Sequence, residues 1–509
     1  MRERPRAGEE QQVPASRGAR LYARAEALAT RRNAVVVLVL AGAALLAIFA
    51  VRPTYPNYDS YYSLLWGQDL ADGRLPDYDV FRTPTPHPLA TLVAALLSPL
   101  GGAADRVFVL ITMTSFLVLV ALLFRFTQVL LGTLLAIVAA AIVLTRTDLE
   151  FFALRGVVDV PFLTFVFGAA LVELRRPRAG WPVLALLAFA GLVRPEAWVL
   201  SGAYLLWLAP AVPRGRLLGY AALAASAPVL WTLSDLAVTG DPLYSLTSTR
   251  EVAGQVGRQR DLPGAISEIP TGLGGSEKVV NVAVGGLGLL LALWLLRRRA
   301  ALPLAIGALG LAVFLGIATA GLSVIPRYLL IPSLFFNLGV AVALTGWAVV
   351  SARGRRGAEF AIPVALAVVA VAVMAFRAPS YVTDVKKLNS RTLFIGTRFS
   401  ELKEILDHPK VVPLLERCAP ITVPQQTSIP IVRYQTGLPK QAIEASIQQR
   451  RPPERGLLIT GRDFNLEPAA QGGVGSSERS VRKWWSNYAL STFQPVARNE
   501  HWNVYARCD

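Results

Sequence analysis

The sequence has few charged residues and very few cysteines and histidines. Only 17% of its 509 residues are Asp, Glu, Lys or Arg, whereas soluble globular proteins carry about 25%. Its two cysteines cannot by themselves supply the four ligands of a structural zinc site. Hydrophobic residues make up 53% of the chain and come in blocks long enough to cross a bilayer. The composition therefore indicates an integral membrane protein.

The excess of positive charge does not form a basic soluble face. The net charge is +17, but most of the excess is arginine in short segments between apolar blocks. Arginine in such segments orients a membrane protein by the positive-inside rule. We therefore expect membrane lipids, and no nucleic acid, as partners. The 44 Arg against 7 Lys also suggest a bacterial source with a GC-rich genome.

Eleven apolar blocks are candidates for membrane spans. They are centred on residues 34–51, 107–124, 128–145, 160–174, 181–194, 197–211, 217–233, 278–296, 301–321, 328–350 and 360–376. The first block has no evident small-residue cleavage site and should remain as a span. A twelfth apolar segment, residues 89–100, is too short to cross and should be interfacial or re-entrant.

The arginines fix the expected topology. With eleven spans and residues 1–33 as a basic cytoplasmic tail, the arginine-bearing loops all fall on the cytoplasmic side. These loops carry Arg125; Arg175, Arg176 and Arg178; Arg214 and Arg216; Arg297, Arg298 and Arg299; and Arg353, Arg355 and Arg356. A span at 89–100 would move every later cluster outside. The sequence thus predicts an α-helical multi-pass protein of about 11 transmembrane helices over residues 34–377, with a first outer loop at 52–106.

Residues 378–509 should form a small extracytoplasmic α/β domain. A helical stretch at 398–416 precedes short apolar runs at 421–423, 456–460 and 502–506, which favour strands. Cys418 and Cys508 lie in this region, and outside the cytoplasm they are expected to form a disulfide. The glycine-rich run Gly472–Ser477 follows no strand, which favours a surface loop over a phosphate loop. The Gly-rich outer segment 234–277 is expected to be a disordered connector, with a mobile cover over an outer-face cavity as the alternative.

Ionisable residues gather on the expected outer face. Asp59 follows Tyr58 at the start of an aromatic stretch. It is a candidate helix N-cap and a candidate general base at the membrane surface, and the two roles are compatible. His87 lies in Pro86-His87-Pro88-Leu89, where it either binds a phosphate or is incidental to a proline-rich turn.

Three further outer segments carry arginine. Arg155 and Asp159 stand four residues apart and would pair if the segment were helical, while Asp159 is also a candidate helix cap. The pair Arg194 and Glu196 falls between two spans, near membrane depth, where charges are costly. The two residues either serve a site or form a mutual ion pair at a tight turn. Arg327 precedes Tyr328 at the start of the tenth span, as a phosphate ligand or an interfacial anchor.

These residues come from five separate outer segments at a similar depth. The set is Asp59, His87, Arg155, Arg194, Glu196 and Arg327. Several arginines on one face, with acids among them, favour an anion-binding cavity, because the guanidinium fork suits phosphate. A phosphate at bilayer depth suggests a lipid-phosphate substrate.

In these motifs the chain resembles the GT-C superfamily of glycosyltransferases over about residues 34–377. The resemblance implies a polyprenyl-phosphate sugar donor, with Asp59 as the base that activates an acceptor hydroxyl and inversion at the sugar carbon. It also implies that His87, Arg155, Arg194, Arg327 and Tyr328 bind the donor phosphate, supported by the acids Asp159 and Glu196. The chain has no tight Asp-x-Asp, so no metal cofactor is expected.

Other functions remain open at this point. A transporter or flippase of a lipid-linked intermediate, or a scaffold for cell-envelope assembly without catalysis, would show the same composition. For a glycosyltransferase, the acceptor would be an outer-face glycan, glycolipid or protein. The sequence names neither the sugar nor the acceptor.

Overall fold

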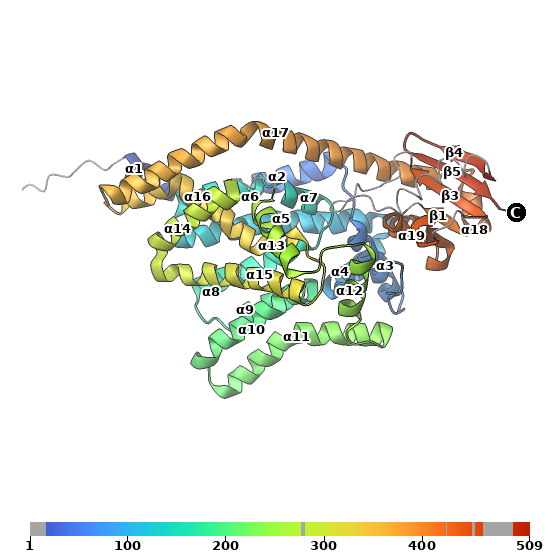
Figure 1. Ribbon diagram of the computed structural model, residues 1–509, viewed down its shortest axis with the longest axis horizontal. Helices are drawn as coiled ribbons and strands as arrows, with labels where there is room; N and C mark the ends of the chain where they lie inside the picture. The colour runs from blue at the N-terminus through green and yellow to red at the C-terminus, as the bar shows by residue number, and fades with distance from the viewer. Residues whose placement is uncertain (1–16, 276–279, 424, 450–452, 462–491, 509) are drawn as a thin grey trace, which may run out of the picture.

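The computed structural model describes residues 17–275, 280–423, 425–449, 453–461 and 492–508. The chain forms a helical bundle with a small sheet near its C-terminus (Figure 1). Helix α1 lies at one end of the long axis and the sheet lies at the other. We call these the α1 end and the sheet end.

Twenty α-helices are described. The first ten are α1 Arg17–Leu28, α2 Arg31–Val51, α3 Tyr58–Ala71, α4 Pro88–Leu97, α5 Ala104–Leu131, α6 Thr133–Leu144, α7 Thr147–Leu154, α8 Asp159–Arg175, α9 Trp181–Val193 and α10 Glu196–Leu208. The others are α11 Arg214–Thr239, α12 Tyr244–Gln255, α13 Leu262–Gly274, α14 Gly285–Leu296, α15 Ala301–Thr319, α16 Leu330–Ala352, α17 Ala358–Leu406, α18 Val412–Arg417, α19 Ile429–Thr436 and α20 Ser446–Gln449. Short turns of other helix types include η1 Ser98–Ala103, η4 Val280–Val284, η5 Arg297–Ala300 and η6 Pro326–Leu329.

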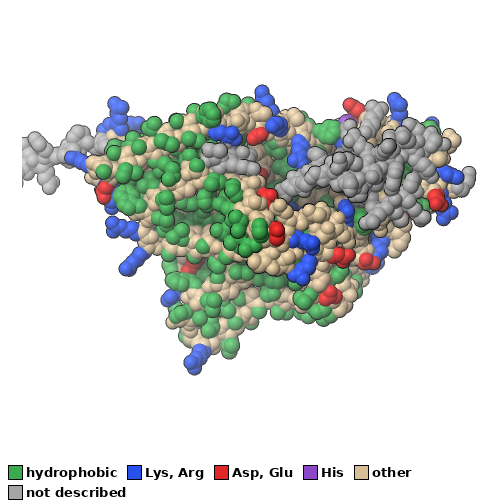
Figure 2. Space-filling view, viewed as in Figure 1, with side chains coloured by type: hydrophobic (Ala, Val, Ile, Leu, Met, Phe, Trp, Pro, Cys, Tyr) green, Lys and Arg blue, Asp and Glu red, His purple; other side chains and the backbone are tan. Residues whose placement is uncertain are grey.

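The expected spans have counterparts in the bundle. Within the described residues, each of the eleven predicted blocks overlaps one helix: α2, α5, α6, α8, α9, α10, α11, α14, α15, α16 and α17. By length and composition alone, six helical stretches are able to cross a membrane, or seven if the bent pair α7–α8 is one span. Hydrophobic side chains cover the flank of the bundle in Figure 2, with most charged side chains toward its two ends. The chain is a multi-pass membrane protein.

The first outer loop is helical and lies at the sheet end. It contains α3 and the short helix α4, which is separated from α5 by η1 and a backbone reversal at Gly101, where φ is 54°. Helices α3 and α4 pack closely, since a Cβ on Gly67 would approach the backbone of Ala94 to 2.6 Å. The segment predicted to be interfacial or re-entrant is thus a separate short helix.

Helix α16 is the central helix of the bundle, and 83% of its most apolar window is buried. It runs parallel to α14, because Gly285 faces Phe336 and Gly288 faces Gly339. It runs antiparallel to α15, and η5 therefore closes a hairpin between α14 and α15. Small residues allow the close backbone approach on which helix packing in lipid depends.

The arginine-bearing turns lie at the α1 end. Helix α1 reaches the α5–α6 turn, where the Glu26 carboxylate accepts a hydrogen bond from the Thr133 hydroxyl at 2.8 Å. Arg353, at the α16–α17 turn, donates to the carbonyl of Leu295 next to the α14–α15 turn at 3.0 Å. The tail predicted at 1–33 thus includes a packed helix, while residues 1–16 lie outside the described residues.

The C-terminal sheet has five strands in the order β2-β1-β3-β5-β4. They are β1 Ile421–Val423, β2 Ile443–Ala445, β3 Gly456–Gly461, β4 Gln494–Arg498 and β5 Trp502–Arg507. Strand β1 is parallel to β2 and β3, whereas β5 is antiparallel to β3 and β4. A disulfide joins Cys418 to Cys508, next to β5. The small α/β domain predicted from the sequence is present, and Gly472–Ser477 lies outside the described residues.

Two segments differ from the sequence analysis. Helix α17 continues from the bundle into the C-terminal domain, so the expected boundary at 377/378 falls inside a 49-residue helix. The segment 234–277 is not a connector where the structure describes it, because it holds the end of α11 and the helices α12 and α13. The Asp261 side chain caps α13 by accepting from the Gly264 amide at 3.1 Å, a local signal that its glycine content concealed.

Candidate active site

Helix α3 starts with Asn57 as its cap and leaves Asp59 free of that role. The Asn57 side chain accepts from the Ser60 amide at 3.0 Å, as an N-cap does. The backbone N–H of Asn57 donates to the backbone carbonyl of Arg155 at 2.7 Å. The Ser60 hydroxyl donates to the Gly156 carbonyl at 2.7 Å. These bonds fix the start of α3 against the α7–α8 junction, and the alternative that Asp59 is a cap is wrong.

The guanidinium of Arg194 donates hydrogen bonds to two carboxylates, those of Asp159 and Glu196. Its guanidinium forms an ion pair with Asp159 at the start of α8 and donates to Glu196 at the start of α10, with Nε–Oε1 at 3.1 Å. The side chains of Arg194 and Asp159 are 8% and 2% exposed. A lone charge at this depth would be costly, so the two acids stabilise the buried arginine and join α8 to the α9–α10 turn.

Arg327 is the less compensated cation. It lies on η6, with its guanidinium nitrogens 3.8 Å from Asp59 and 4.0 Å from Asp159, beyond hydrogen-bond distance. Its side chain is 28% exposed, and its Nε has no hydrogen-bond partner among the described residues. The Tyr328 ring lies under both arginines, 4.7 Å from Arg194 and 5.9 Å from Arg327. Arg327 thus has donor capacity left for an anion.

Arg155 does not pair with Asp159, the pairing that the four-residue spacing suggests. Helices α7 and α8 are bent by 114° at their junction, so Arg155 does not lie one helical turn from Asp159, which pairs with Arg194. The Arg155 guanidinium lies over the Tyr55 and Phe151 rings at 5.4 and 4.9 Å, away from the cavity wall. Burial lowers the pKa of Arg155 to about 10.

His87 sits where the first outer loop enters α4. Its ring meets the Trp231 ring edge-on, with the centroids 6.1 Å apart, and it hydrogen-bonds the Val193 backbone. Burial, reinforced by Arg194 and Arg327 and opposed by Asp59, lowers the pKa of His87 to about 4. The ring is therefore neutral near pH 7 and adds no positive charge to the site.

A cavity of about 510 Å³ unites most of these residues. Its polar end holds Asp59, His87, Asp159, Arg194, Glu196, Arg327 and Tyr328. Its apolar flank is formed mainly by side chains of α10, α11 and α15, such as Val199, Trp231 and Ile317. The helices that line it lie together in Figure 1. An amphiphile with an anionic head and an apolar tail matches this lining.

The sequence analysis missed Asp235, Trp198 and Trp231 of this cavity. Asp235 lies near the end of α11 and accepts from the Ser245 amide and hydroxyl at 2.9 and 2.8 Å. The two tryptophans face each other edge-on at 5.7 Å. Trp198 and Trp231 fall within blocks that hydropathy assigns to spans, whereas Asp235 follows the end of the 217–233 block. A carboxylate so close to the end of a span was the available signal for Asp235.

A second buried polar cluster surrounds Arg146. Its guanidinium forms an ion pair with Asp148 and donates to Ser333 and Asn337 at 2.8 and 2.9 Å. Asn337 in turn donates to Asn281 at 3.0 Å. This network joins the α6–α7 turn to α16 and η4, and its members are absent from the lining of the large cavity. We assign it a packing role.

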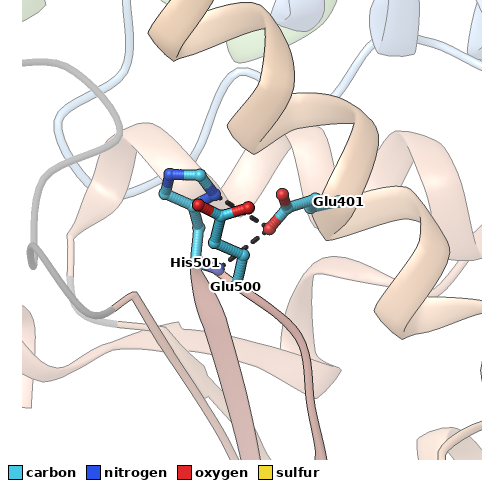
Figure 3. Close-up of side chains that lie close together, drawn as sticks. All are labelled: Glu401, Glu500 and His501. Atoms are coloured by element: carbon cyan, nitrogen blue, oxygen red, sulfur yellow. Dashed lines mark hydrogen bonds and ion pairs between the residues drawn. The ribbon is translucent and has the colours of Figure 1, made fainter.

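One group in the described part of the chain has ligand spacing suited to a metal ion. Glu401, Glu500 and His501 place their ligand atoms within 4.8 Å of one another, in the C-terminal domain (Figure 3). One Glu401 oxygen accepts from both the amide and the ring Nδ1 of His501, each at 2.9 Å. These bonds dock the β4–β5 turn on α17 and account for the cluster without a metal.

The comparisons with known proteins agree with this architecture. No protein-family model and no curated protein sequence matches the chain. ArnT from Cupriavidus metallidurans bound to undecaprenyl phosphate superposes with a TM-score of 0.50 at 16% identity, over 93% of this chain and 98% of ArnT. The oligosaccharyltransferase AglB from Archaeoglobus fulgidus, in complex with an inhibitory peptide and a dolichol-phosphate, gives a TM-score of 0.43 at 13% identity, over 80% of this chain and 64% of AglB. At this identity the likeness concerns the fold alone, and the chain has the fold of ArnT.

Proposed function

We propose that the protein transfers a sugar from a polyprenyl-phosphate donor to an acceptor hydroxyl. The observation that carries this proposal is one cavity with a carboxylate and an incompletely paired arginine at its polar end and a flank of apolar side chains. The structural likeness to a protein bound to undecaprenyl phosphate supports the same class of donor.

Arg327 would hold the donor phosphate, and the prenyl chain would lie along α10, α11 and α15. The donor nitrogens of Arg327 are not engaged at hydrogen-bond distance by Asp59 or Asp159. Arg194 would act mainly by positioning Tyr328 and the acids, because Asp159 and Glu196 already balance it. Arg155 does not line the cavity and would act from behind its wall. Of the residues that the sequence predicts to bind the phosphate, Arg327 and Tyr328 would therefore form the phosphate site.

Asp59 would serve as the general base. The acceptor hydroxyl gives its proton to the Asp59 carboxylate, and its oxygen forms a bond to the anomeric carbon of the sugar. The bond between that carbon and the phosphate oxygen breaks, and polyprenyl phosphate leaves with its charge stabilised by Arg327. A single displacement of this kind inverts the anomeric configuration.

The reaction would take place on the extracytoplasmic face. The cavity is at the sheet end, opposite the arginine-bearing turns that the positive-inside rule assigns to the cytoplasm. The C-terminal domain packs beside the cavity, since Lys440 pairs with Asp77 at 2.6 Å and Arg82 donates to Gln426 at 3.3 Å. An acceptor from the cell envelope, whether glycan, glycolipid or protein, would approach the cavity from the extracytoplasmic side.

A transfer assay in nanodiscs tests the proposal. Purified protein would be incubated with undecaprenyl-phosphate sugars carrying a radiolabel in the sugar, and with envelope extract as the acceptor pool. We expect label on an acceptor together with release of undecaprenyl phosphate, unaffected by EDTA because the proposed step uses no metal. Movement of the lipid between leaflets without label transfer would favour a flippase, and neither activity would favour a scaffold.

A further inference from the structure

Two hydrogen-bond acceptors at the polar end of the cavity lack partners within the described residues. One is Oε2 of Glu196, whose other oxygen binds Arg194, and the second is Nδ1 of His87. Both side chains line the cavity. Each of these atoms has less than 1 Å² of accessible surface. Buried polar atoms are nearly always satisfied in a working protein, so a ligand group is expected here.

Whether Nδ1 of His87 donates or accepts a hydrogen bond depends on the protonation of the other ring nitrogen, Nε2. The ring hydrogen-bonds the Val193 backbone, whose carbonyl acts as an acceptor. Because Nδ1 has no partner in the described chain, this bond is made by Nε2–H. A neutral imidazole carries one N–H, so Nδ1 is then an acceptor. The low pKa of His87 agrees with a ring that stays neutral.

Two unpartnered acceptors in the lining of one cavity do not suit a phosphate. Phosphate oxygens of a lipid phosphodiester accept hydrogen bonds, and they would meet the Glu196 carboxylate and the His87 lone pair without a proton between them. A group with its own donors, such as a pair of hydroxyls, satisfies both. On this ground His87 would recognise a neutral, hydroxyl-bearing group, and not the phosphate that the sequence predicts as its ligand.

The wall beside these atoms is aromatic. Trp198 donates its indole N–H to the Gly191 carbonyl at 3.0 Å, and Trp231 donates its own to the Ser245 hydroxyl at 2.9 Å. Both indole donors are thus already used, and what the rings offer the cavity is their hydrocarbon surface. The faces of aromatic rings are electron-rich and attract the polarised C–H groups on one side of a sugar ring.

We propose that His87, Glu196, Trp198 and Trp231 form the subsite that recognises the sugar of the donor. This inference rests on the proposed function and adds to it where the sugar lies and how it is selected. Hydroxyls of a pyranose or furanose would donate to Nδ1 of His87 and Oε2 of Glu196. One face of the sugar ring would lie against the tryptophans, and the phosphate would lie toward Arg327.

Equilibrium binding separates this subsite from the phosphate site. The probes are undecaprenyl phosphate and a panel of its hexosyl and pentosyl esters, measured on purified protein in nanodiscs. The main variant is His87→Phe, which keeps a ring against Trp231 and removes the acceptor. We expect its affinity for bare undecaprenyl phosphate to stay within about twofold of wild type, and that for the preferred sugar ester to fall about five- to tenfold.

Two further variants test whether an effect of His87→Phe on binding comes only from a general loss of folding. Trp231→Leu removes the ring face and leaves His87 and Glu196 in place, and it should lose the preference for the sugar ester in the same way. His408→Phe changes a histidine of the C-terminal domain, outside the cavity lining, and should bind both probes like wild type. Monodisperse elution of each variant establishes that it is folded.

Each outcome decides between the two proposals. A wild-type protein that binds neither probe contradicts the proposed function and the subsite together. Equal weakening of bare and sugar-bearing lipid by His87→Phe overturns the subsite and returns His87 to the phosphate, with the proposed function intact. Wild-type binding that ignores every sugar of the panel likewise overturns the subsite alone.

Discussion

In the proposed reaction, the chemistry depends on Asp59 and Arg327. Their side chains approach to 3.8 Å at the polar end of the cavity, and each is about a quarter exposed. Both side chains line the cavity, so the carboxylate would be open to an acceptor and the guanidinium to the proposed leaving phosphate. The neighbouring cation, Arg194, is neutralised by two acids and cannot replace Arg327.

Replacing Asp59 by Asn should stop transfer without preventing donor binding. An amide cannot accept the acceptor proton, and the loss of a general base lowers turnover by about 10²–10⁴-fold. Initial rates of sugar transfer, with the donor dissociation constant measured in parallel, check this prediction. A rate within tenfold of wild type would remove Asp59 from the role of base.

The contribution of His87 to donor binding should not vary with pH between about 8 and 5. Its pKa of about 4 lies below the ordinary value of 6.5 because the ring is buried, so the ring stays neutral across this range. Below about pH 4.5 it gains a proton, Nδ1 stops accepting, and the advantage over His87→Phe should disappear. Asp59, Glu196, Arg194 and Arg327 also face this ring, so the ratio of the two affinities at each pH is the quantity to follow. A ratio that rises on acidification through pH 6.5 would indicate a cationic phosphate ligand instead.

At the scale of helices and strands, the α14–α16 contact depends on glycine. A methyl group on Gly288 would collide with the Gly339 carbonyl, so Gly288→Ala should cost about 1–3 kcal/mol through overpacking. Gly202 on α10 has no neighbour within 4 Å of an added Cβ, and Gly202→Ala should stay within about 0.5 kcal/mol of wild type. Thermal unfolding of both variants in detergent checks the pair. Equal effects would show that the helices do not meet as described.

Much of the architecture at this scale follows from local sequence signals. Hydropathy located the helices that overlap the eleven predicted spans, and block length identified α4 as a separate short helix. The partners of the site charges could not be found in the same way. Asp159 pairs with Arg194, 35 residues along the chain, and the bend between α7 and α8 removes its expected partner, Arg155. Helical spacing describes neighbours on one helix, whereas the cavity joins residues from several.

Residues inside spans were the least visible from sequence. Trp198 and Trp231 line the cavity, yet a periodic apolar block gives no sign of which of its faces meets lipid. The glycine content of residues 234–277 favours a connector and hides the local signal for a helix, which is the cap of α13 at Asp261. Such features depend on tertiary packing, which a local pattern does not contain.

At the scale of the whole molecule, the account requires the two ends of the bundle to face opposite compartments. Fusion of alkaline phosphatase after residue 509 should give an active enzyme, because the C-terminal domain and its disulfide belong outside the cytoplasm. The same reporter placed in the α16–α17 turn should be inactive, since Arg353 and Arg355 mark the cytoplasmic side. The reverse pattern would place the cavity on the cytoplasmic face and contradict the proposed site of transfer.

The measurement that tests the central claim most directly is a density map of the protein with bound undecaprenyl phosphate. The account predicts the phosphate within hydrogen-bond distance of the Arg327 guanidinium, on the side of the cavity facing Asp59. The prenyl chain should run along α10, α11 and α15. A phosphate bound elsewhere, for example beside Arg146 and Arg377 at the small cavity of about 200 Å³, would contradict it.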